Sequence, residues 1–192
     1  MDKERDHVTL YSPQAGPVWQ AVIKDGVAYS RREYVQKKYE ECASIFLAAY
    51  DAYVREAEKI APRPESYAYP YWAFASVEQL DLSGGGKIMT LSVPLEEVVF
   101  FDQYEWYKVL RLSYLGETEE EEADFERKLR MRGIRDSSDV VLKPFYPDLK
   151  REITTSWKRL FRHDSAIRSG DTSCVRAVQA GLWRIKKEWL ID

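Results

Sequence analysis

The sequence has 192 residues, a formal net charge of −3 at pH 7, 45% hydrophobic and 32% charged residues. This composition is typical of one folded domain, and it excludes a disordered chain and a strong overall field for nucleic acid or membrane. Two cysteines without motif spacing and two histidines cannot build a Cys/His metal cluster, so we expect no metal and a reducing compartment. The start MDKERDHVTL has no signal-peptide pattern, and no apolar run reaches about 18 residues. We therefore expect one cytoplasmic domain over residues 1–192, with residues 1–7 disordered and no membrane contact.

In the first half of the chain, the pattern predicts a strand, two helices and an extended segment. Pro17 suits the first position of a helix that Gly26 ends. Apolar residues then recur every three or four positions up to a Pro-rich stretch, which predicts one long helix. The expected elements are a strand at 8–12, helices at 17–25 and about 31–60, and an extended stretch at 67–82.

The second half predicts further strands among several helices. LSGGGK should turn the chain, because β-branched and apolar residues follow it. The expected elements are strands at 87–94, 98–101 and 175–185, helices at 103–115, 117–132 and 148–163, and loops at 137–147 and 164–173. Strands and helices in this irregular order indicate an α+β fold rather than repeated βαβ units.

Three motifs with a known chemical use are better explained structurally. LSGGGK lacks the phosphate-loop spacing, since Lys87 is followed by Ile88 and a strand. The carboxylate run at 117–126 suits the start of a helix whose end is basic. His163 stands at a helix end without a nucleophile placed beside it.

Two polar residues are candidates for a site. Asp102 can cap the helix that follows it, with Glu105 completing a capping box, or it can stand at the mouth of an aromatic cleft. Gln179 lies in an apolar strand and needs hydrogen-bond partners, and Gly181 permits close approach of a ligand or another backbone.

A basic stretch around a tryptophan is a candidate nucleic-acid surface. Basic side chains contact phosphates and an aromatic ring stacks on bases. The same pattern also describes an amphipathic helix with its basic face in water. The residues concerned are Lys150, Arg151, Trp157, Lys158, Arg159 and Arg162.

Several stretches together resemble a bacterial domain of unknown function, family 3841. The stretches are VTLYSPQ, YPYWAF, VPLEEVVFFDQYEWYKVL, SWKRLF and VQAGLWRIKKEWL, which cover most of the chain. That family tends to carry a basic run ending in Asp-Leu-Arg after the Trp-rich segment. Here Asp81 and Leu82 are followed by Ser83.

The order of elements is also similar to small ADP-ribosyltransferase-like domains. That similarity implies a single domain with a split antiparallel β-sheet, several helices and NAD in a cleft. It places Tyr11, Ser12 or Gln14 on the first strand and Gln179 on a late strand, where such enzymes carry Glu. An amide stabilises developing positive charge less well than a carboxylate, so an inactive relative or a binder is also implied.

Two functions from different classes follow. The first is an NAD- or nucleotide-binding domain, as an ADP-ribosyltransferase-like toxin, defence or phage-encoded protein that modifies a protein or nucleic acid. Gln179 and Tyr11 would be catalytic. The cofactor would contact Tyr11, Gln14, Tyr71, Trp72, Asp102 and Trp106. The alternative is a non-enzymatic module that binds a protein or nucleic acid.

Overall fold

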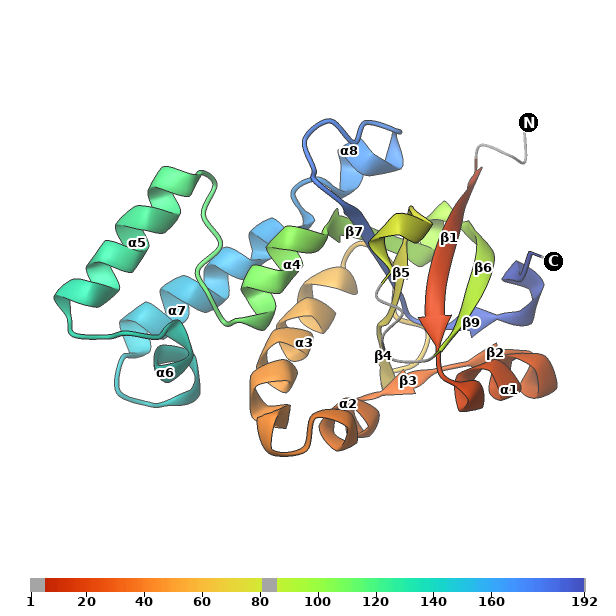
Figure 1. The fold of residues 1–192 in the computed structure, drawn as a ribbon, viewed down its shortest axis with the longest axis horizontal. Helices are drawn as coiled ribbons and strands as arrows, with labels where there is room; N and C mark the ends of the chain where they lie inside the picture. The colour runs from red at the N-terminus through yellow and green to blue at the C-terminus, as the bar shows by residue number, and fades with distance from the viewer. Residues whose placement is uncertain (1–5, 81–85, 192) are drawn as a thin grey trace.

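An antiparallel sheet and a group of helices lie at opposite ends of the molecule (Figure 1). This computed structural model describes residues 6–80 and 86–191. The sheet has the strand order β6-β1-β5-β8-β7, and all neighbouring strands are antiparallel. Its strands are β1 (His7–Gln14), β5 (Tyr71–Phe74), β6 (Lys87–Pro94), β7 (Val98–Asp102) and β8 (Val178–Leu182). The predicted α+β class is confirmed.

The pairing between β1 and β5 is the shortest in the sheet. These two strands share one register pair, Tyr11 with Phe74, whereas β1 pairs with β6 along its whole length. The Ser12 hydroxyl adds one bond across this junction, to the carbonyl of Trp72 at 2.7 Å. The β6–β1 ribbon and the β5–β8–β7 ribbon are therefore joined over a short distance only.

Each face of the sheet has its own hydrophobic core. Alternate residues of a strand point to opposite faces, so residues 98 and 100 of β7 enter one core and residues 99 and 101 the other. The first core is covered by α1 (Gly16–Asp25), α8 (Asp164–Arg168) and the turn η6 (Lys187–Trp189). The second is covered by α3 (Ala43–Ala57), α4 (Gln103–Leu110) and the turn η5 (Trp157–Phe161).

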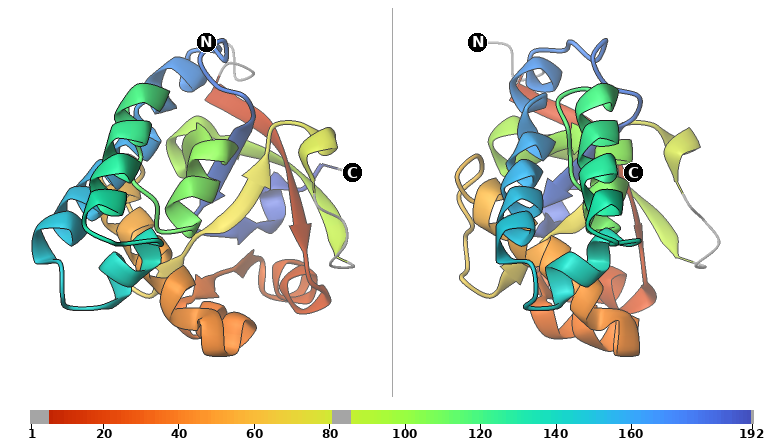
Figure 2. Two further views of the ribbon diagram at one scale, coloured as in Figure 1. Left: turned by 60° about the vertical axis from the view of Figure 1, so that its left-hand side comes forward. Right: turned by 90° about the vertical axis from the view of Figure 1, so that its left-hand side faces the viewer.

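Three further helices form a lobe beyond α3 and α4 (Figure 2). The helical lobe consists of α5 (Glu119–Met131), α6 (Ser137–Leu142) and α7 (Pro147–Ser156). Thr118 caps α5 by accepting a bond from the Glu121 amide at 3.2 Å, and four glutamates fill its first turn. Caps and first-turn carboxylates stabilise a helix start. The charged segment therefore forms the predicted solvated helix.

The prediction of one continuous helix over 31–60 is wrong, because the helix is interrupted in its middle. The chain forms α2 (Arg32–Tyr39), a turn η2 (Glu40–Cys42) and then α3. Glu40 has φ 43°, outside the helical region, so the helix cannot continue through it. Helix α4 also stops before the expected residue 115, since Leu112 is buried with φ 56°. Periodicity could not show either break, because apolar spacing continues across both.

Both predicted loops in the second half contain short helices. Helix α6 lies within 137–147, where the Asp136 carboxylate accepts a bond from the Ser138 amide at 2.8 Å. Helix α8 lies within 164–173. Conversely, the helix expected at 148–163 divides into α7 and η5, and the strand expected at 175–185 is shorter.

The remaining segments are short. Two-residue strands pair as β2 (Val27–Ala28) with β9 (Ile185–Lys186), and β3 (Ser30–Arg31) with β4 (Ala68–Tyr69). Single turns η3 (Val77–Gln79) and η4 (Leu95–Glu97) precede β6 and β7.

Two predicted segments, the N-terminus and the glycine turn, lie partly outside the described residues. His7 belongs to β1, so expected disorder over 1–7 is wrong for that residue, and residues 1–5 lie outside the described part. Most of LSGGGK also lies outside it.

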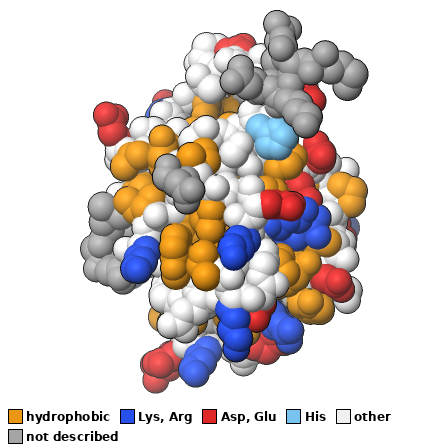
Figure 3. Space-filling view, turned by 90° about the vertical axis from the view of Figure 1, so that its right-hand side faces the viewer, with side chains coloured by type: hydrophobic (Ala, Val, Ile, Leu, Met, Phe, Trp, Pro, Cys, Tyr) orange, Lys and Arg blue, Asp and Glu red, His pale blue; other side chains and the backbone are white. Residues whose placement is uncertain are grey.

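The surface over α1, β6 and the C-terminal turns has no large patch of side chains of one charge. Hydrophobic, basic and acidic side chains are interspersed on this side (Figure 3). Within residues 6–80 and 86–191, no helix is long and apolar enough to cross a membrane.

Candidate functional site

The residues predicted to line an aromatic cleft are packed in the interior. Exposed fractions are 8% for Tyr71, 5% for Asp102, 2% for Trp106 and 4% for Gln179. Trp72 is half-buried, and its indole N–H donates to the Tyr50 hydroxyl at 2.7 Å. Trp72 and Trp106 therefore belong to the core between the sheet and α3, and Tyr71 belongs to the core on the other face. Asp102, although buried, lines a polar pocket.

The two predicted catalytic residues nevertheless share one face of the sheet. Tyr11, Phe74, Gln179 and Phe101 stand opposite one another on four successive strands. Tyr11 and Gln179 are therefore separated by β5. Gln14 lies three positions from Tyr11 and so points to the other face, where its amide donates to the Ser12 hydroxyl at 2.8 Å. Tyr11 and Gln14 cannot contact one ligand on a single face.

Gly181 permits the close approach that its position suggested, but the group that approaches is Tyr53. A Cβ on Gly181 would lie 1.9 Å from the Tyr53 hydroxyl oxygen. That hydroxyl and the Gln179 Oε1 are buried and have no hydrogen-bond partner among the described residues. Burial raises the pKa of Tyr53 well above its ordinary value. The Tyr53 hydroxyl and the Gln179 Oε1 are therefore buried polar groups without hydrogen bonds inside an aromatic core.

Asp102 caps α4, as one of the two readings predicted. Its carboxylate accepts from the amides of Tyr104 and Arg176, both at 2.7 Å, and so ties β7, α4 and the segment before β8 together. The second half of the predicted capping box does not form, because Glu105 pairs with Arg162 instead.

The stacking role predicted for Trp157 is wrong. Its ring is 3% exposed, and its N–H donates to the Ser113 carbonyl at 2.7 Å. Arg159 donates to the Leu115 carbonyl at 2.9 Å and Arg162 to the Gly116 carbonyl at 3.0 Å. Both guanidinium groups also pair with glutamates. Of the predicted set, Arg151, Lys158 and Arg162 are exposed, and Lys150 and Arg159 are half-buried.

A large hollow lies elsewhere, where the helical lobe meets α3 and α4. We call it the lobe cleft, and it offers a volume of about 1130 Å³ to water-sized molecules. Ligand sites of drug-sized molecules usually occupy about 300–1,000 Å³. The apolar lining residues are Ile45, Phe46, Leu110, Phe125, Leu129 and Ile134. The cleft thus has room for a ligand and an apolar wall to bury it.

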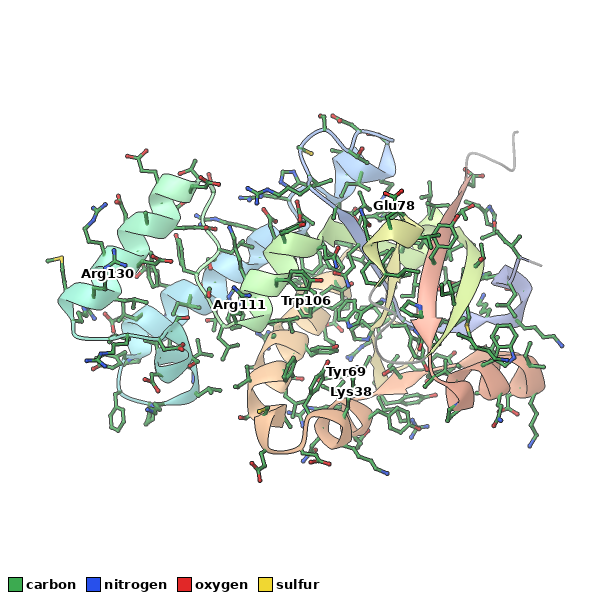
Figure 4. All side chains as sticks on the ribbon, viewed as in Figure 1. Lys38, Tyr69, Glu78, Trp106, Arg111 and Arg130 are labelled. Atoms are coloured by element: carbon green, nitrogen blue, oxygen red, sulfur yellow. The ribbon has the colours of Figure 1, made fainter. Side chains whose placement is uncertain are left out.

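Two arginines of the lobe cleft are unpaired. Arg111 and Arg135 line it, and neither guanidinium has an ion pair or hydrogen bond among the residues that the structure describes. Arg130 pairs only with exposed Glu126, at 3.4 Å. Figure 4 shows Arg111 at the end of α4 and Arg130 on α5, the helices that provide two walls of the cleft. Four basic side chains and three carboxylates, Glu122, Glu126 and Asp136, line the cleft, so its lining carries a small excess of positive charge beside an apolar surface.

Both non-glycine residues with positive φ in the described chain adjoin this cleft. Glu40 is two residues from the lining residue Cys42, and Leu112 follows the lining residue Arg111. Such conformations are unfavourable and gather at functional sites. No sequence pattern indicated this cleft, because its lining residues come from distant segments of the chain. In addition, Glu40 and Leu112 interrupt segments that the sequence predicted to be continuous helices.

A second, polar pocket lies on the other side of the Lys108–Glu122 ion pair. The polar pocket has a volume of about 580 Å³, and Lys108 and Glu122, 2.7 Å apart, line both hollows. Its other charged or titratable lining residues are Asp102, Tyr104, Glu105, Glu117, Glu119, Arg159, Arg162, His163, Cys174 and Arg176.

Two titratable groups of the polar pocket are perturbed in opposite directions. Burial raises the pKa of Glu105, although Arg162 opposes the shift. Burial and the neighbouring Arg162 lower the pKa of His163, whose Nε2 accepts from the Arg162 Nε at 3.1 Å.

Across the described ranges, no group of three Cys, His, Asp or Glu side chains is placed to hold a metal.

Comparisons with known proteins identify a family and no activity. A family model described as "Domain of unknown function (DUF3841)" matches residues 9–191. No curated protein and no solved structure matches the chain.

Proposed function

We propose that this chain, which belongs to the DUF3841 family, binds a nucleotide-type ligand, with NAD and nucleoside phosphates as the ligand class, in the lobe cleft. The family description assigns no activity, so the proposal rests on the geometry of the cleft.

The observation that carries the proposal is the pair of unpaired guanidinium groups at Arg111 and Arg135. Arginine binds phosphate through charge-assisted and frequently bidentate hydrogen bonds. Both side chains are exposed, so phosphate groups bound there would replace water as the partners of these guanidinium groups. A nucleotide satisfies both parts of the cleft, since its phosphates are anionic and its base is flat and apolar on its faces.

The apolar wall suits the base of such a ligand. Phe46 and Phe125 both line the cleft, and each already stacks on a tyrosine ring, Tyr39 at 3.5 Å and Tyr114 at 4.3 Å between centroids. Stacked rings hold their neighbours in place, so a ligand would meet a formed wall. Aromatic contacts of this kind contribute about 0.5–1.5 kcal/mol beyond area burial.

Binding, rather than ADP-ribosyl transfer, is the function proposed. Gln179 is a buried amide, and a carboxylate would stabilise the positive charge that develops as nicotinamide leaves. Release of nicotinamide from NAD, in the presence of candidate protein or nucleic-acid acceptors, is the assay for transferase activity. If nicotinamide were released and alanine at Gln179 or Tyr11 abolished the release, the proposal would have to be extended to catalysis.

Cysteine labelling tests the proposal at the site itself. Cys42 lines the lobe cleft and Cys174 the polar pocket, and both thiols are exposed. Iodoacetamide labelling of each, followed by peptide mass spectrometry, reports on both hollows in one experiment. We expect millimolar NAD or ATP to slow labelling of Cys42 several-fold and to leave Cys174 unchanged. Equal protection of both thiols, or of neither, would contradict the assignment.

Charge-neutral variants test the two arginines. We expect Arg111→Gln and Arg135→Gln each to weaken nucleotide binding about tenfold, as about 1.4 kcal/mol for a charge-assisted bond implies. The control is Arg55→Gln, which removes the same charge from an exposed position on α3 outside the lining of the cleft. An equal loss in the control would indicate general electrostatic attraction instead.

The alternative function is a protein- or nucleic-acid-binding module. Arg151 and Lys158 are exposed basic residues of the predicted surface without an ion pair in the described chain, whereas the exposed Arg162 pairs with Glu105. A mobility shift with single-stranded DNA or RNA that weakens steeply with salt, and that Lys158→Gln reduces, would favour this alternative.

A further inference from the structure

We propose that the polar pocket is a second binding site, distinct from the lobe cleft, and that it takes a cationic ligand that carries a guanidinium or primary amine. Glu105 is the residue that recognises the cation.

The buried carboxylate of Glu105 is the observation that points to a ligand. The residue is 8% exposed and lines the pocket. Its Oε1 pairs with the guanidinium of Arg162, whereas its Oε2 is buried without a partner among the residues of the described ranges. A buried charged oxygen without a donor is costly to a fold. A ligand N–H at this oxygen would remove that cost.

The charges around Glu105 favour a cation over an anion. Five carboxylates line the pocket against four cationic side chains, and the lowered pKa of His163 favours its neutral form. Three of these cations already have carboxylate partners in ion pairs, Lys108 with Glu122, Arg162 with Glu105 and Arg176 with Glu119. The fourth, Arg159, pairs with Glu117 and also with Glu121, which does not line the pocket. Asp102 is balanced by backbone amides only.

Arg176, a side chain of the protein itself, already makes in this pocket the contacts that a cationic ligand would make. The Arg176 guanidinium lies 5.7 Å from the centre of the Tyr104 ring and 3.5 Å from the Glu119 carboxylate. A ring face with a carboxylate beside it is a favourable place for a guanidinium or ammonium group. Arg176 is exposed, so an arriving cation can take its place beside Tyr104 and Glu119.

The direct test is a titration with agmatine, which carries a guanidinium and an amine on a four-carbon chain. Its neutral relative N-butylurea is the control ligand. We expect calorimetry to detect agmatine binding and no N-butylurea binding. Amide NMR signals of Gly116 and Arg176, at the polar pocket, should shift with agmatine, while Gly133 at the lobe cleft should not. Equal binding of both ligands, or no binding of either, overturns the proposal.

Matched variants separate recognition by Glu105 from general charge. Glu105→Gln should weaken agmatine at least tenfold, since a charge-assisted bond is lost. Glu120→Gln removes a charge from the same region at an exposed residue that does not line the pocket, and it should leave binding within twofold. If the single variant unfolds, Glu105→Gln with Arg162→Gln removes both charges of the pair and should also abolish binding. Unchanged affinity in a folded Glu105 variant refutes the site.

These outcomes are independent of the nucleotide proposal. Agmatine should bind without any nucleotide, and NAD or ATP should protect Cys42 without agmatine. Either site can therefore fail alone.

Discussion

Replacing Gly181 by alanine should strain the aromatic core. The new Cβ would lie 1.9 Å from the Tyr53 hydroxyl oxygen, 2.8 Å from Tyr53 Cζ and 3.4 Å from a ring carbon of Trp72. Tyr53 cannot easily move away, because its ring contacts five others at centroid distances of 5.0 to 6.2 Å. The contact must therefore be relieved by shifting packed groups.

The expected cost follows from the general cost of overpacking. Extra methylene groups in a packed core typically cost about 1–3 kcal/mol. For a domain of this size, about 1 kcal/mol lowers the midpoint by roughly 2–4 °C, so we expect Tm to fall by about 2–12 °C. Urea unfolding followed by tryptophan fluorescence gives the free energy directly. Gly16→Ala is the control, since a Cβ there meets nothing within 4 Å.

A double-mutant cycle tests the cause. Tyr53→Phe removes a buried hydroxyl that has no partner in the described chain, so alone it should cost little or stabilise. In that background Gly181→Ala should cost less, although the ring carbon at 2.8 Å preserves part of the clash. A Gly181→Ala variant as stable as the parent, or a cost unchanged by Tyr53→Phe, would refute this reasoning.

Three further predictions concern buried carboxylates. Asp102→Ala should destabilise the protein by about 2–3 kcal/mol in urea unfolding, because two backbone amides lose their acceptor; a loss under 0.5 kcal/mol would argue against the cap. Asp164→Ala leaves the Phe100 amide and the Arg168 guanidinium without this carboxylate, and should cost about 3 kcal/mol; Asp164→Asn, which keeps an acceptor, should cost less. Because the folded pKa of Glu105 is raised above 4.5, the folded state binds its proton more tightly, and this residue's contribution to stability should fall as pH rises from about 4.5 through that higher pKa. Glu105→Gln should remove that part of the pH dependence, and identical pH–stability profiles for parent and variant would contradict the shift.

The elements with strong local signals were predictable from the sequence. Pro17 and Gly26 delimited α1, and Gly26 indeed has the positive φ of 81° that glycine tolerates. The alternating residues of β6 and the cap at Asp102 were likewise local features. Each depends on a few neighbouring residues, which a sequence shows directly.

The site was not predictable in the same way. The same aromatic residue types occur in cores and in ligand clefts. The sequence therefore could not show that Trp72 and Trp106 pack in the core. The lobe cleft unites Cys42, Arg111 and Arg135 across nearly a hundred positions, and unpaired arginines are recognised only once their neighbours are known. Helices α6 and α8 were missed because each is too short to show a period of 3.6 residues.

The ion pair between Lys108 and Glu122 forms a wall common to both hollows. A phosphate in one hollow attracts Lys108, and a cation in the other attracts Glu122. Each ligand would thus loosen the bond that holds the wall closed and change the affinity for the other. Linkage requires the two effects to be equal in free energy. Each site would still bind its own ligand alone, but the affinity at one site would depend on whether the other is occupied.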